Sequence, residues 1–264
     1  MKYLEIDNIS YVYPNGHVAL ENISLSFDKK ESVAIIGQNG AGKTTLSKLI
    51  NKLLTVSEGD IFIDGKSTKN LSTATVARKV GYVFQNPDEQ IFQDSIFNEI
   101  AYALKLLRYP KEEIKRRVEE VAEICGLAGY LSEHPYNLPY SKRKFITIAA
   151  VLVMDTDIII LDEPTAGQDI NSIKRLGKIL DYLKNKEKIV ITITHDMEFV
   201  AEYFDRVIVM ANRKKLIDSN PKEIFWNKEI LKEASLKPPY ICELAELMEV
   251  KDIISIDELL KKER

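Results

Sequence analysis

Residues 37–44 combine glycines, a lysine and a threonine at a spacing that suits phosphate binding. They read Gly-Gln-Asn-Gly-Ala-Gly-Lys-Thr and follow the apolar run 33–36. This order matches G-x-x-x-x-G-K-[ST], a strand-to-helix loop whose backbone N–H groups converge on phosphate oxygens. A glycine-rich turn without a ligand is the alternative, and the preceding apolar run argues against it. The residues expected to contact a nucleotide are Gly37, Asn39, Gly40, Ala41, Gly42, Lys43, Thr44 and Thr45.

We expect residues of this loop and of a second, acidic segment to bind phosphate and magnesium and to activate water. The Lys43 ammonium would reach the β- and γ-phosphates of ATP, and the Thr44 hydroxyl would bind Mg²⁺. An acidic pair, Asp162 and Glu163, follows the apolar run 158–161. Asp162 would hold the magnesium ion, and Glu163, pointing to the opposite side of an extended chain, would polarise the attacking water as a general base. Simple turn formation is the alternative for such a pair.

One histidine also follows a buried apolar run. His195 comes directly after residues 189–194, at the sheet edge where α/β proteins bind their ligands. We expect it to contact the γ-phosphate. His17 and His134 have no such position, and we interpret both as structural.

Composition limits the remaining possibilities. The 264 residues are 45% hydrophobic, enough for one large domain or for one domain with a small appended lobe. The net charge of −3, from 37 basic and 40 acidic residues, gives no excess positive field for nucleic acid. Cys125 and Cys242 are far apart and lack metal-ligand spacing, so we expect two buried small hydrophobes in a reducing compartment.

The apolar runs predict an α/β fold. Short β-branched runs bounded by turn residues open the chain and predict antiparallel strands, whereas later near-continuous apolar runs are typical of a parallel sheet buried on both faces. All of these runs are shorter than the roughly 20 residues that cross a bilayer. The antiparallel candidates are residues 3–6, 23–27 and 61–63, and the parallel candidates are 33–36, 80–84, 158–161, 189–193 and 207–210.

A helical period replaces these runs at about residues 88–150 and predicts an inserted helical subdomain. We assign residues 1–220 to one ATP-binding domain that contains this insertion. Residues 221–264 form a charged C-terminal extension interrupted by Pro238 and Pro239. An apolar face in the extension suits either dimerisation or packing on the chain's own core. This face comprises Ile241, Leu244, Leu247 and Met248.

The order of these motifs resembles that of the ABC ATPases over essentially residues 1–210. Tyr13-Pro14 resembles the aromatic loop that stacks on adenine in that family. Gln85 resembles the glutamine-loop residue, which approaches magnesium, takes part in catalysis and moves with the transmembrane partner. Residues 161–165 match the magnesium and catalytic-base segment, 166–169 the D-loop, and 194–196 the switch histidine.

The resemblance implies an ATPase with a mixed, mainly parallel RecA-like sheet, an antiparallel β subdomain and a helical subdomain, using ATP and Mg²⁺. A closer similarity is to the energy-coupling-factor branch, whose ATPases serve importers of vitamins and transition-metal ions. Residues 84–92 resemble its extended glutamine loop and 236–239 the start of its C-terminal extension. In that branch two ATPases lie on the cytoplasmic membrane face, peripherally, beneath a transmembrane coupling protein and a substrate-binding membrane subunit.

One segment departs from the family. ABC ATPases carry Leu-Ser-Gly-Gly-Gln where residues 138–142 read Leu-Pro-Tyr-Ser-Lys. In the family, that serine and the following N–H groups bind the γ-phosphate held by the opposite subunit. Pro139 lacks both hydroxyl and N–H, and Tyr140 is bulky where only hydrogen is tolerated. We expect the site completed by this segment to be slow or silent.

The departure favours an asymmetric heterodimer with a second ABC ATPase whose signature is intact. That partner would complete the site built on Lys43, Asp162, Glu163 and His195 of this chain. Compensation by the cations at 142–144 is one alternative. A nucleotide-gated regulatory module with little hydrolysis is another, and the retained Glu163 argues against it. An ABC protein of DNA repair or translation is a third alternative. Such proteins usually carry long insertions, and nucleic-acid binding calls for a basic stripe; neither is seen in this sequence.

Overall fold

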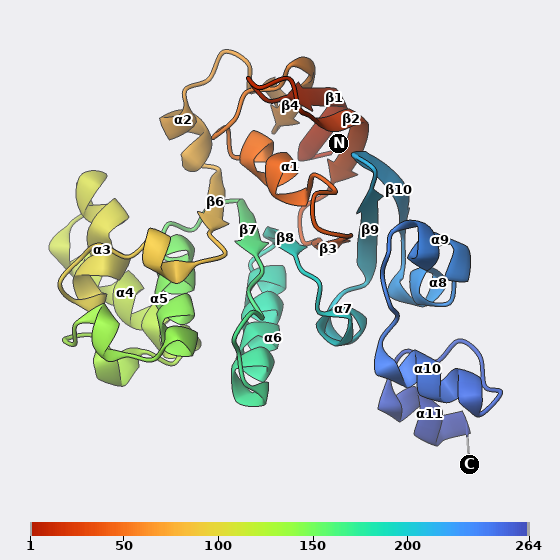
Figure 1. Cartoon of the computed structure of the whole chain (residues 1–264). Helices are drawn as coiled ribbons and strands as arrows, with labels where there is room; N and C mark the ends of the chain where they lie inside the picture. Colours follow the sequence, from red (N-terminus) through yellow and green to blue (C-terminus); the bar gives the residue numbers. More distant parts are fainter. Residues whose placement is uncertain (1, 263–264) are drawn as a thin grey trace.

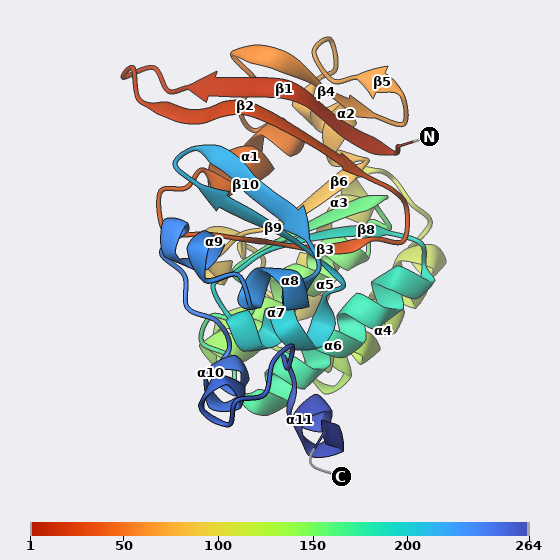
Figure 2. The same cartoon turned by 90° about the vertical axis from the view of Figure 1, so that its right-hand side faces the viewer.

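The computed structural model describes residues 2–262. A small antiparallel sheet lies at one end, a larger sheet follows, and a lobe of helices lies beside the larger sheet (Figure 1). The last two helices, α10 (Tyr240–Leu247) and α11 (Ile256–Lys262), lie at the end opposite the small sheet (Figures 1 and 2). No helix among residues 2–262 is long and apolar enough to cross a membrane.

The larger sheet has the strand order β10-β9-β3-β8-β7-β6. All neighbouring pairs are parallel except β9 and β10, which form an antiparallel edge. Every residue of β7 and β8 is buried, as expected for parallel strands covered on both faces. The strands are β3 (Ser32–Ile36), β6 (Val80–Val83), β7 (Ile158–Asp162), β8 (Ile189–Ile193), β9 (Arg206–Ala211) and β10 (Lys214–Ser219).

The smaller sheet has the order β2-β1-β4-β5 and is antiparallel. Its first two strands are longer than the apolar runs predict, because irregularities in pairing interrupt the apolar alternation without ending the strands. Asn8 and Asn22 have positive φ angles of 47° and 51° in these strands. The elements are β1 (Leu4–Val12), β2 (Val18–Phe27), β4 (Glu58–Ile63) and β5 (Lys66–Ser67), with α1 (Lys43–Ile50) and α2 (Thr73–Ala77) following β3 and β5.

The helical lobe runs from residue 87 to residue 152, whereas the helical period predicts about 88–150. Ser95 caps its first helix by accepting from the N–H of Asn98, and Gly126 ends the second in a left-handed conformation. Its elements are η1 (Pro87–Glu89), α3 (Ile96–Leu106), α4 (Lys111–Cys125), η2 (Ala128–Tyr130), η3 (Pro135–Asn137) and α5 (Tyr140–Leu152).

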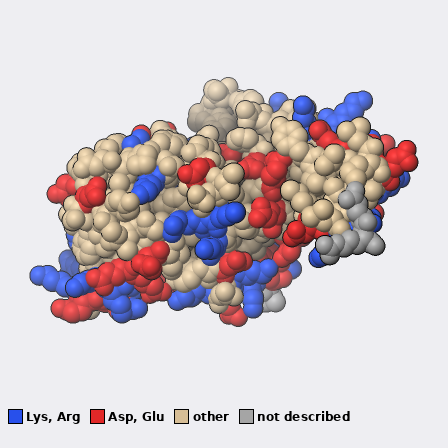
Figure 3. Space-filling view, turned by 90° about the horizontal axis from the view of Figure 1, so that it is seen from below, with Lys and Arg blue, Asp and Glu red and all other residues tan. Residues whose placement is uncertain are grey.

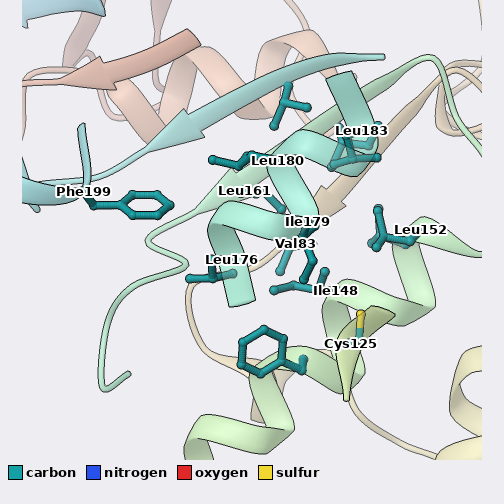
Figure 4. Close-up of a cluster of buried hydrophobic side chains, with 14 of the residues drawn as sticks. Val83, Cys125, Ile148, Leu152, Leu161, Leu176, Ile179, Leu180, Leu183 and Phe199 are labelled. Carbon is teal, nitrogen blue, oxygen red and sulfur yellow. The ribbon is translucent and has the colours of Figure 1, made fainter. Parts of the chain in front are cut away.

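Each face of the larger sheet has its own core. Ile35 and Ile160 pack with the smaller sheet and α1, while Ile36 and Leu161 pack with the helices of the opposite face. Two helices of that opposite face are α6 (Ile170–Asn185) and α7 (Met197–Tyr203). Figure 4 shows apolar side chains of α5, α6 and the strands meeting in this second core.

Four short helices form the C-terminal part: α8 (Pro221–Phe225), α9 (Lys228–Glu233), α10 (Tyr240–Leu247) and α11 (Ile256–Lys262). A small core holds them together, and Trp226 Nε1 donates to the carbonyl of Ile253 at 3.0 Å. The backbone N–H of Tyr240 donates to Glu198 of α7 at 3.1 Å. The tail therefore docks on the ATP-binding domain through specific polar contacts.

Most of the predicted apolar face of α10 does not pack on the chain's own core. Ile241 packs against the core, but Leu244, Leu247 and Met248 are exposed, and Leu247 reaches 84% exposure. Cys242 and Ala245 fill the buried side instead. Packing on the chain's own core is thus wrong for three of the four predicted residues.

Both cysteines are buried, as predicted. Burial raises the pKa of Cys125 to about 12 and that of Cys242 to about 11. On the surface, Lys and Arg side chains are bordered by Asp and Glu side chains across the face seen from below (Figure 3).

Candidate functional site

The chain places its phosphate loop, acidic pair and switch histidine around one pocket of about 660 Å³. This follows from the parallel sheet, since the carboxyl ends of β3, β7 and β8 meet at one edge. Most predicted contacts line the pocket, but Ala41 is buried behind the loop and donates its N–H to the Gln38 carbonyl. The lining includes Tyr13, Gly37, Asn39, Gly40, Gly42, Lys43, Thr44, Thr45, Gln85, Asp162, Glu163 and His195.

Two glycines of the loop are required by close approach. A Cβ on Gly37 would lie 2.0 Å from the carbonyl oxygen of Met210, and Gly37 has a φ of +152°. A Cβ on Gly42 would lie 2.7 Å from the Ala19 carbonyl oxygen, with φ at +98°. The loop can therefore tighten against β2 and β9 and lead directly into α1 only with glycine at both positions.

Lys43 begins α1 and turns back over the loop. Its ammonium donates to the carbonyls of Gly37 and Gln38 at 2.7 and 3.0 Å. Burial lowers the pKa of Lys43, whereas Glu163 and Asp162 oppose that shift. An ammonium has three N–H donors, so one donor remains for an anion in the pocket.

Tyr13 lies at the pocket wall and is fixed from two sides. Its hydroxyl is 2.9 Å from Thr45 Oγ1, and its ring stacks on His17 with a centroid separation of 6.4 Å and an interplanar angle of 24°. His17 also lines the pocket. The interpretation of His17 as merely structural missed this position, because the short turn after Tyr13 brings it back beside the ring. His134, in contrast, caps η3 by accepting from the N–H of Tyr136.

Asp162 ends β7 and is buried. Its Oδ2 accepts a hydrogen bond from the Tyr82 hydroxyl at 2.7 Å. Burial and the neighbouring Asp162 carboxylate raise the pKa of Tyr82, so the phenol stays protonated and donates. The same hydroxyl lies 3.2 Å from Ser47 Oγ on α1.

Glu163 has an unusual backbone and an unpaired carboxylate oxygen. Its φ is +47°, a conformation that costs a non-glycine residue ~1–3 kcal/mol. Its N–H donates to the Ile193 carbonyl at 2.8 Å. Glu163 Oε2 lies 2.8 Å from His195 Nδ1, yet this contact lacks hydrogen-bond alignment, and within residues 2–262 the buried Oε2 has no hydrogen-bond partner. A buried carboxylate oxygen left unpaired beside a pocket suits a group that receives a proton.

Gln85 reaches the pocket with an exposed side chain while its backbone is held from behind. The fully buried Lys144 donates to the carbonyls of Phe84, Gln85 and Asp162, the first at 3.0 Å and the last at 3.3 Å. Burial lowers the pKa of Lys144 to about 8, although Asp162 and Glu163 favour its charged form. One cation therefore ties the glutamine loop to the end of β7.

The oxygen donors at this edge fit a magnesium ion that shares its ligands with phosphates. The exposed Thr44 hydroxyl, the Gln85 side chain and the Asp162 carboxylate all line the pocket, and hard oxygen ligands are what Mg²⁺ prefers. Among residues 2–262 no three or more His, Cys, Asp or Glu residues form a self-sufficient metal cluster. Magnesium commonly takes one or two carboxylates and completes its shell with water and phosphate.

Comparison with known proteins identifies the family. A family model described as ABC transporter matches residues 20–166. This chain belongs to the ABC transporter family. The matched region contains the phosphate loop, Gln85 and the acidic pair. The prediction of an ABC-type ATPase is therefore confirmed.

Two relatives and one solved structure extend the comparison. The energy-coupling factor transporter ATP-binding protein EcfA of Methanocaldococcus jannaschii is 37% identical over 97% of this ABC ATPase and 93% of its own length. A Methanosarcina mazei ABC transporter ATP-binding protein is 39% identical over 93% of the chain, which spans only 42% of that relative. Clostridium perfringens cbiO1, part of the ABC transporter complex cbiONQ, matches with a TM-score of 0.81 and 32% identity over 94% of the chain and 99% of its own. The predicted fold and the resemblance to the energy-coupling-factor branch are confirmed.

Residues 138–142, which the sequence comparison predicts to be a degenerate signature segment, lead into α5. Pro139 precedes the helix and provides no side-chain cap. The next residue, Tyr140, is 38% exposed and lies beside Gly167 of the D-loop, where a Cβ would be 3.3 Å from its ring. Gln168 Nε2 also donates to the Ser141 carbonyl at 3.4 Å. An aromatic ring thus occupies the helix start that serine and glycine form in the family.

The cations after this segment are engaged within the chain. Lys142 donates to the Tyr130 hydroxyl at 2.6 Å, and Arg143 pairs with Asp88 at 2.9 Å. Lys144 is fully buried. Lys144 is therefore too buried to compensate for lost donors at a partner's phosphate, and the same role for Lys142 and Arg143 stays an alternative.

Several pocket or supporting residues besides His17 escaped prediction. Tyr82 lies in an apolar run and resembles a core position, and Lys144 follows two other cations and resembles a surface position, so only their buried polar partners reveal a role. Ser235 and Leu236 line the pocket from the linker between α9 and α10. Their position at the pocket depends on how the C-terminal part folds back, which sequence spacing does not predict.

Proposed function

We propose that this ABC ATPase is the ATP-hydrolysing subunit of an energy-coupling-factor importer for vitamins or transition-metal ions, acting in an asymmetric heterodimer. The observation that carries the proposal is the contrast between two parts of the chain. Lys43, Asp162, Glu163 and His195 converge on one pocket, whereas the helix start that would complete a partner's site carries Pro139 and Tyr140.

The chain's own residues would divide the work of hydrolysis as follows. Lys43 offers its remaining N–H donor to the phosphates, and Tyr13 presents its ring to adenine. Magnesium, held by Thr44, Gln85 and Asp162 together with the phosphates, would neutralise charge that develops on the transferred phosphoryl group. A nucleotide bound in the pocket would replace water at the exposed side of the phosphate loop. The oxygens that would hold magnesium would then face the nucleotide.

Glu163 would accept the proton of the attacking water. Its unpaired Oε2 is buried beside the pocket and close to His195, so an entering water would supply the missing partner. His195, with a side chain that is 70% exposed, is free to turn toward the γ-phosphate. The positive φ of Glu163 sets the direction of the carboxylate.

The second composite site would be slow for a steric and a chemical reason. Pro139 supplies neither hydroxyl nor N–H, and the Tyr140 ring stands where close approach of a phosphate is needed. Loss of one preorganised donor commonly costs about 10²–10³ in rate. A partner with Leu-Ser-Gly-Gly-Gln would restore donors at the competent site only, and hydrolysis there would reopen the dimer.

The C-terminal extension is proposed to stabilise that dimer. Leu244, Leu247 and Met248 form an exposed apolar face on α10, and Tyr240 at its start is also exposed. Such a face on a short docked helix suits a second ATPase subunit. The glutamine-loop side would pass the movement to a transmembrane coupling protein with its substrate-binding subunit, with this chain peripheral at the cytoplasmic membrane face.

Affinity purification from the native host tests this function. The chain would be tagged, membranes solubilised gently, and stoichiometric partners identified by mass spectrometry. We expect a second ABC ATPase with an intact signature together with a multi-span membrane protein. Recovery of a homodimer free of membrane proteins would contradict the importer.

A nucleotide-gated regulatory module is the second candidate, favoured by Pro139 and Tyr140. Measuring ATP turnover in the assembled complex distinguishes this module from the importer. Sustained turnover that depends on Glu163 supports the importer, whereas tight ATP binding with hardly any turnover supports the regulatory module.

A further inference from the structure

Tyr82 lies between the two elements that carry the proposed magnesium ligands. Its hydroxyl donates to Asp162 Oδ2 at 2.7 Å and contacts Ser47 Oγ at 3.2 Å. Ser47 stands one turn after Thr44 on α1 and donates to the Thr44 carbonyl at 2.9 Å. The hydroxyl therefore bridges the strand end that holds Asp162 and the helix that holds Thr44.

Packing alone explains the ring of Tyr82 but not its hydroxyl. The ring lies edge-on to Phe84 with centroids 5.0 Å apart and belongs to the core beneath α1. A phenylalanine would keep these contacts. A buried hydroxyl is costly unless it is hydrogen-bonded, and here both of its contacts point at the metal-binding edge.

We propose that Tyr82 is a positioning residue for magnesium, whose hydroxyl fixes the Asp162 carboxylate relative to the helix carrying Thr44. The inference rests on the proposed assignment of Asp162 and Thr44 as magnesium ligands. The hydrogen bond engages Oδ2 and leaves Oδ1 for the metal. Groups that orient a ligating carboxylate in this way typically contribute about 10- to 100-fold to metal affinity.

The test measures metal binding directly. The full chain is saturated with the non-hydrolysable analogue adenylyl imidodiphosphate, and Mn²⁺, a spectroscopic substitute for Mg²⁺, is titrated by electron paramagnetic resonance. We expect Tyr82→Phe to weaken Mn²⁺ binding by about 10- to 100-fold. Nucleotide affinity in EDTA is expected to remain that of the unmodified chain, because Tyr82 touches no predicted phosphate contact.

Tyr182→Phe is the matched control. The Tyr182 hydroxyl donates to Glu120 at 3.0 Å, so this variant also loses one phenol-to-carboxylate hydrogen bond, away from the pocket. We expect similar shifts in thermal midpoint for both variants but unchanged Mn²⁺ binding in the control. Ser47→Ala, which removes the second contact of the Tyr82 hydroxyl, is expected to weaken Mn²⁺ binding less and in the same direction.

Asp162→Asn distinguishes a failure of the Tyr82 positioning role from a failure of the magnesium assignment of Asp162. If Asp162→Asn loses Mn²⁺ affinity while Tyr82→Phe binds Mn²⁺ like Tyr182→Phe, the positioning role is overturned and the magnesium assignment stands. If Asp162→Asn binds Mn²⁺ normally, the assignment itself is wrong and the role of Tyr82 falls with it. A parallel loss of metal-free nucleotide affinity in Tyr82→Phe would indicate a structural role and also overturn the inference.

Discussion

Glu163 is the residue on which the proposed chemistry depends most directly. Glu163→Gln keeps the shape of the side chain but removes the group that would take the proton of water. We expect turnover in the assembled complex to fall by about 10²–10⁴-fold, with ATP affinity preserved. Turnover under saturating ATP and equilibrium binding of a fluorescent ATP analogue measure the two quantities. Unchanged turnover would remove Glu163 from the role of general base.

Lys144 is expected to matter for stability at the same scale. Lys144→Met keeps an unbranched side chain but leaves the carbonyls of Phe84, Gln85 and Asp162 without their cation. Because an unsatisfied buried acceptor costs about 1–3 kcal/mol, we expect the free energy of unfolding to fall by more than about 2 kcal/mol. Urea denaturation provides the measurement.

Lys142→Met is the control for this change. Lys142 is part-buried and gives one hydrogen bond to Tyr130, so its loss should cost no more than about 1.5 kcal/mol. Equal losses in both variants would mean that the three carbonyls of the Lys144 site find other partners.

Residue types at motif spacing made most of the candidate site predictable. Lys43, Thr44, Asp162 and His195 are all placed by the rule that loops at the carboxyl ends of parallel strands meet. Tyr82 and Lys144 were beyond that rule, because their roles come from side-chain hydrogen bonds across the core. A tyrosine within an apolar strand predicts burial, but spacing gives no direction for its hydroxyl.

In the proposed heterodimer, the N-terminal end of α5 is the element that would make the two composite sites differ. Replacing residues 138–142 by Leu-Ser-Gly-Gly-Gln would restore a hydroxyl and unobstructed N–H donors to the partner's site. We expect hydrolysis at that site to rise by about 10²–10³-fold. The measurement uses a complex whose other site is silenced by Glu163→Gln, so that all remaining turnover comes from the restored site.

The control for this replacement carries Leu-Pro-Tyr-Ser-Lys with Glu163→Gln alone. If both complexes hydrolyse ATP equally slowly, the signature segment is not what limits the second site. In that case the partner's own phosphate loop or general base would be the limiting element.

The two buried cysteines report on two elements of unequal stability. Their raised pKa values, about 12 for Cys125 and about 11 for Cys242, reduce the reactive thiolate at pH 8 by about 10²-fold or more relative to a free thiol. We expect neither thiol to react with a disulfide reagent in the native chain. In rising urea Cys242 should react first, because its short helix α10 buries only Cys242 and Ala245 and is expected to open locally before the rest of the large core. Simultaneous reaction of both would show that the tail unfolds only with the whole domain.

At the scale of the whole molecule, the exposed face of α10 is expected to govern subunit association. Leu247→Glu places a charge where an apolar contact is proposed. Burying a leucine is worth about 1.5–3 kcal/mol, so the dimer dissociation constant should rise by about 10- to 100-fold. Sedimentation of the purified ATPase pair measures it.

Leu106→Glu is a suitable control because Leu106 is also a strongly exposed leucine, 65% against 84% for Leu247, but lies on the helical lobe. It should leave the ATPase pair intact. Equal dissociation constants for both variants would exclude α10 from the dimer interface.

The succession of strands and helices was largely predictable because two different periodicities follow one another along the chain. Continuous apolar runs marked the parallel strands, and the change to helical spacing marked the lobe. The return of Ser235 and Leu236 to the nucleotide pocket was not predictable, since it depends on the docking of Tyr240 on Glu198 and on the fold of the tail.

The three carbonyl oxygens around the Lys144 ammonium resemble the cage with which proteins capture a bare potassium or sodium ion. Here the ion is tethered to α5 by its own side chain and cannot diffuse away. The junction between glutamine loop and β7 therefore keeps its cation at any salt composition of the surrounding fluid. In the proposed importer, this junction would need no ion from the surrounding fluid to hold its three carbonyls together.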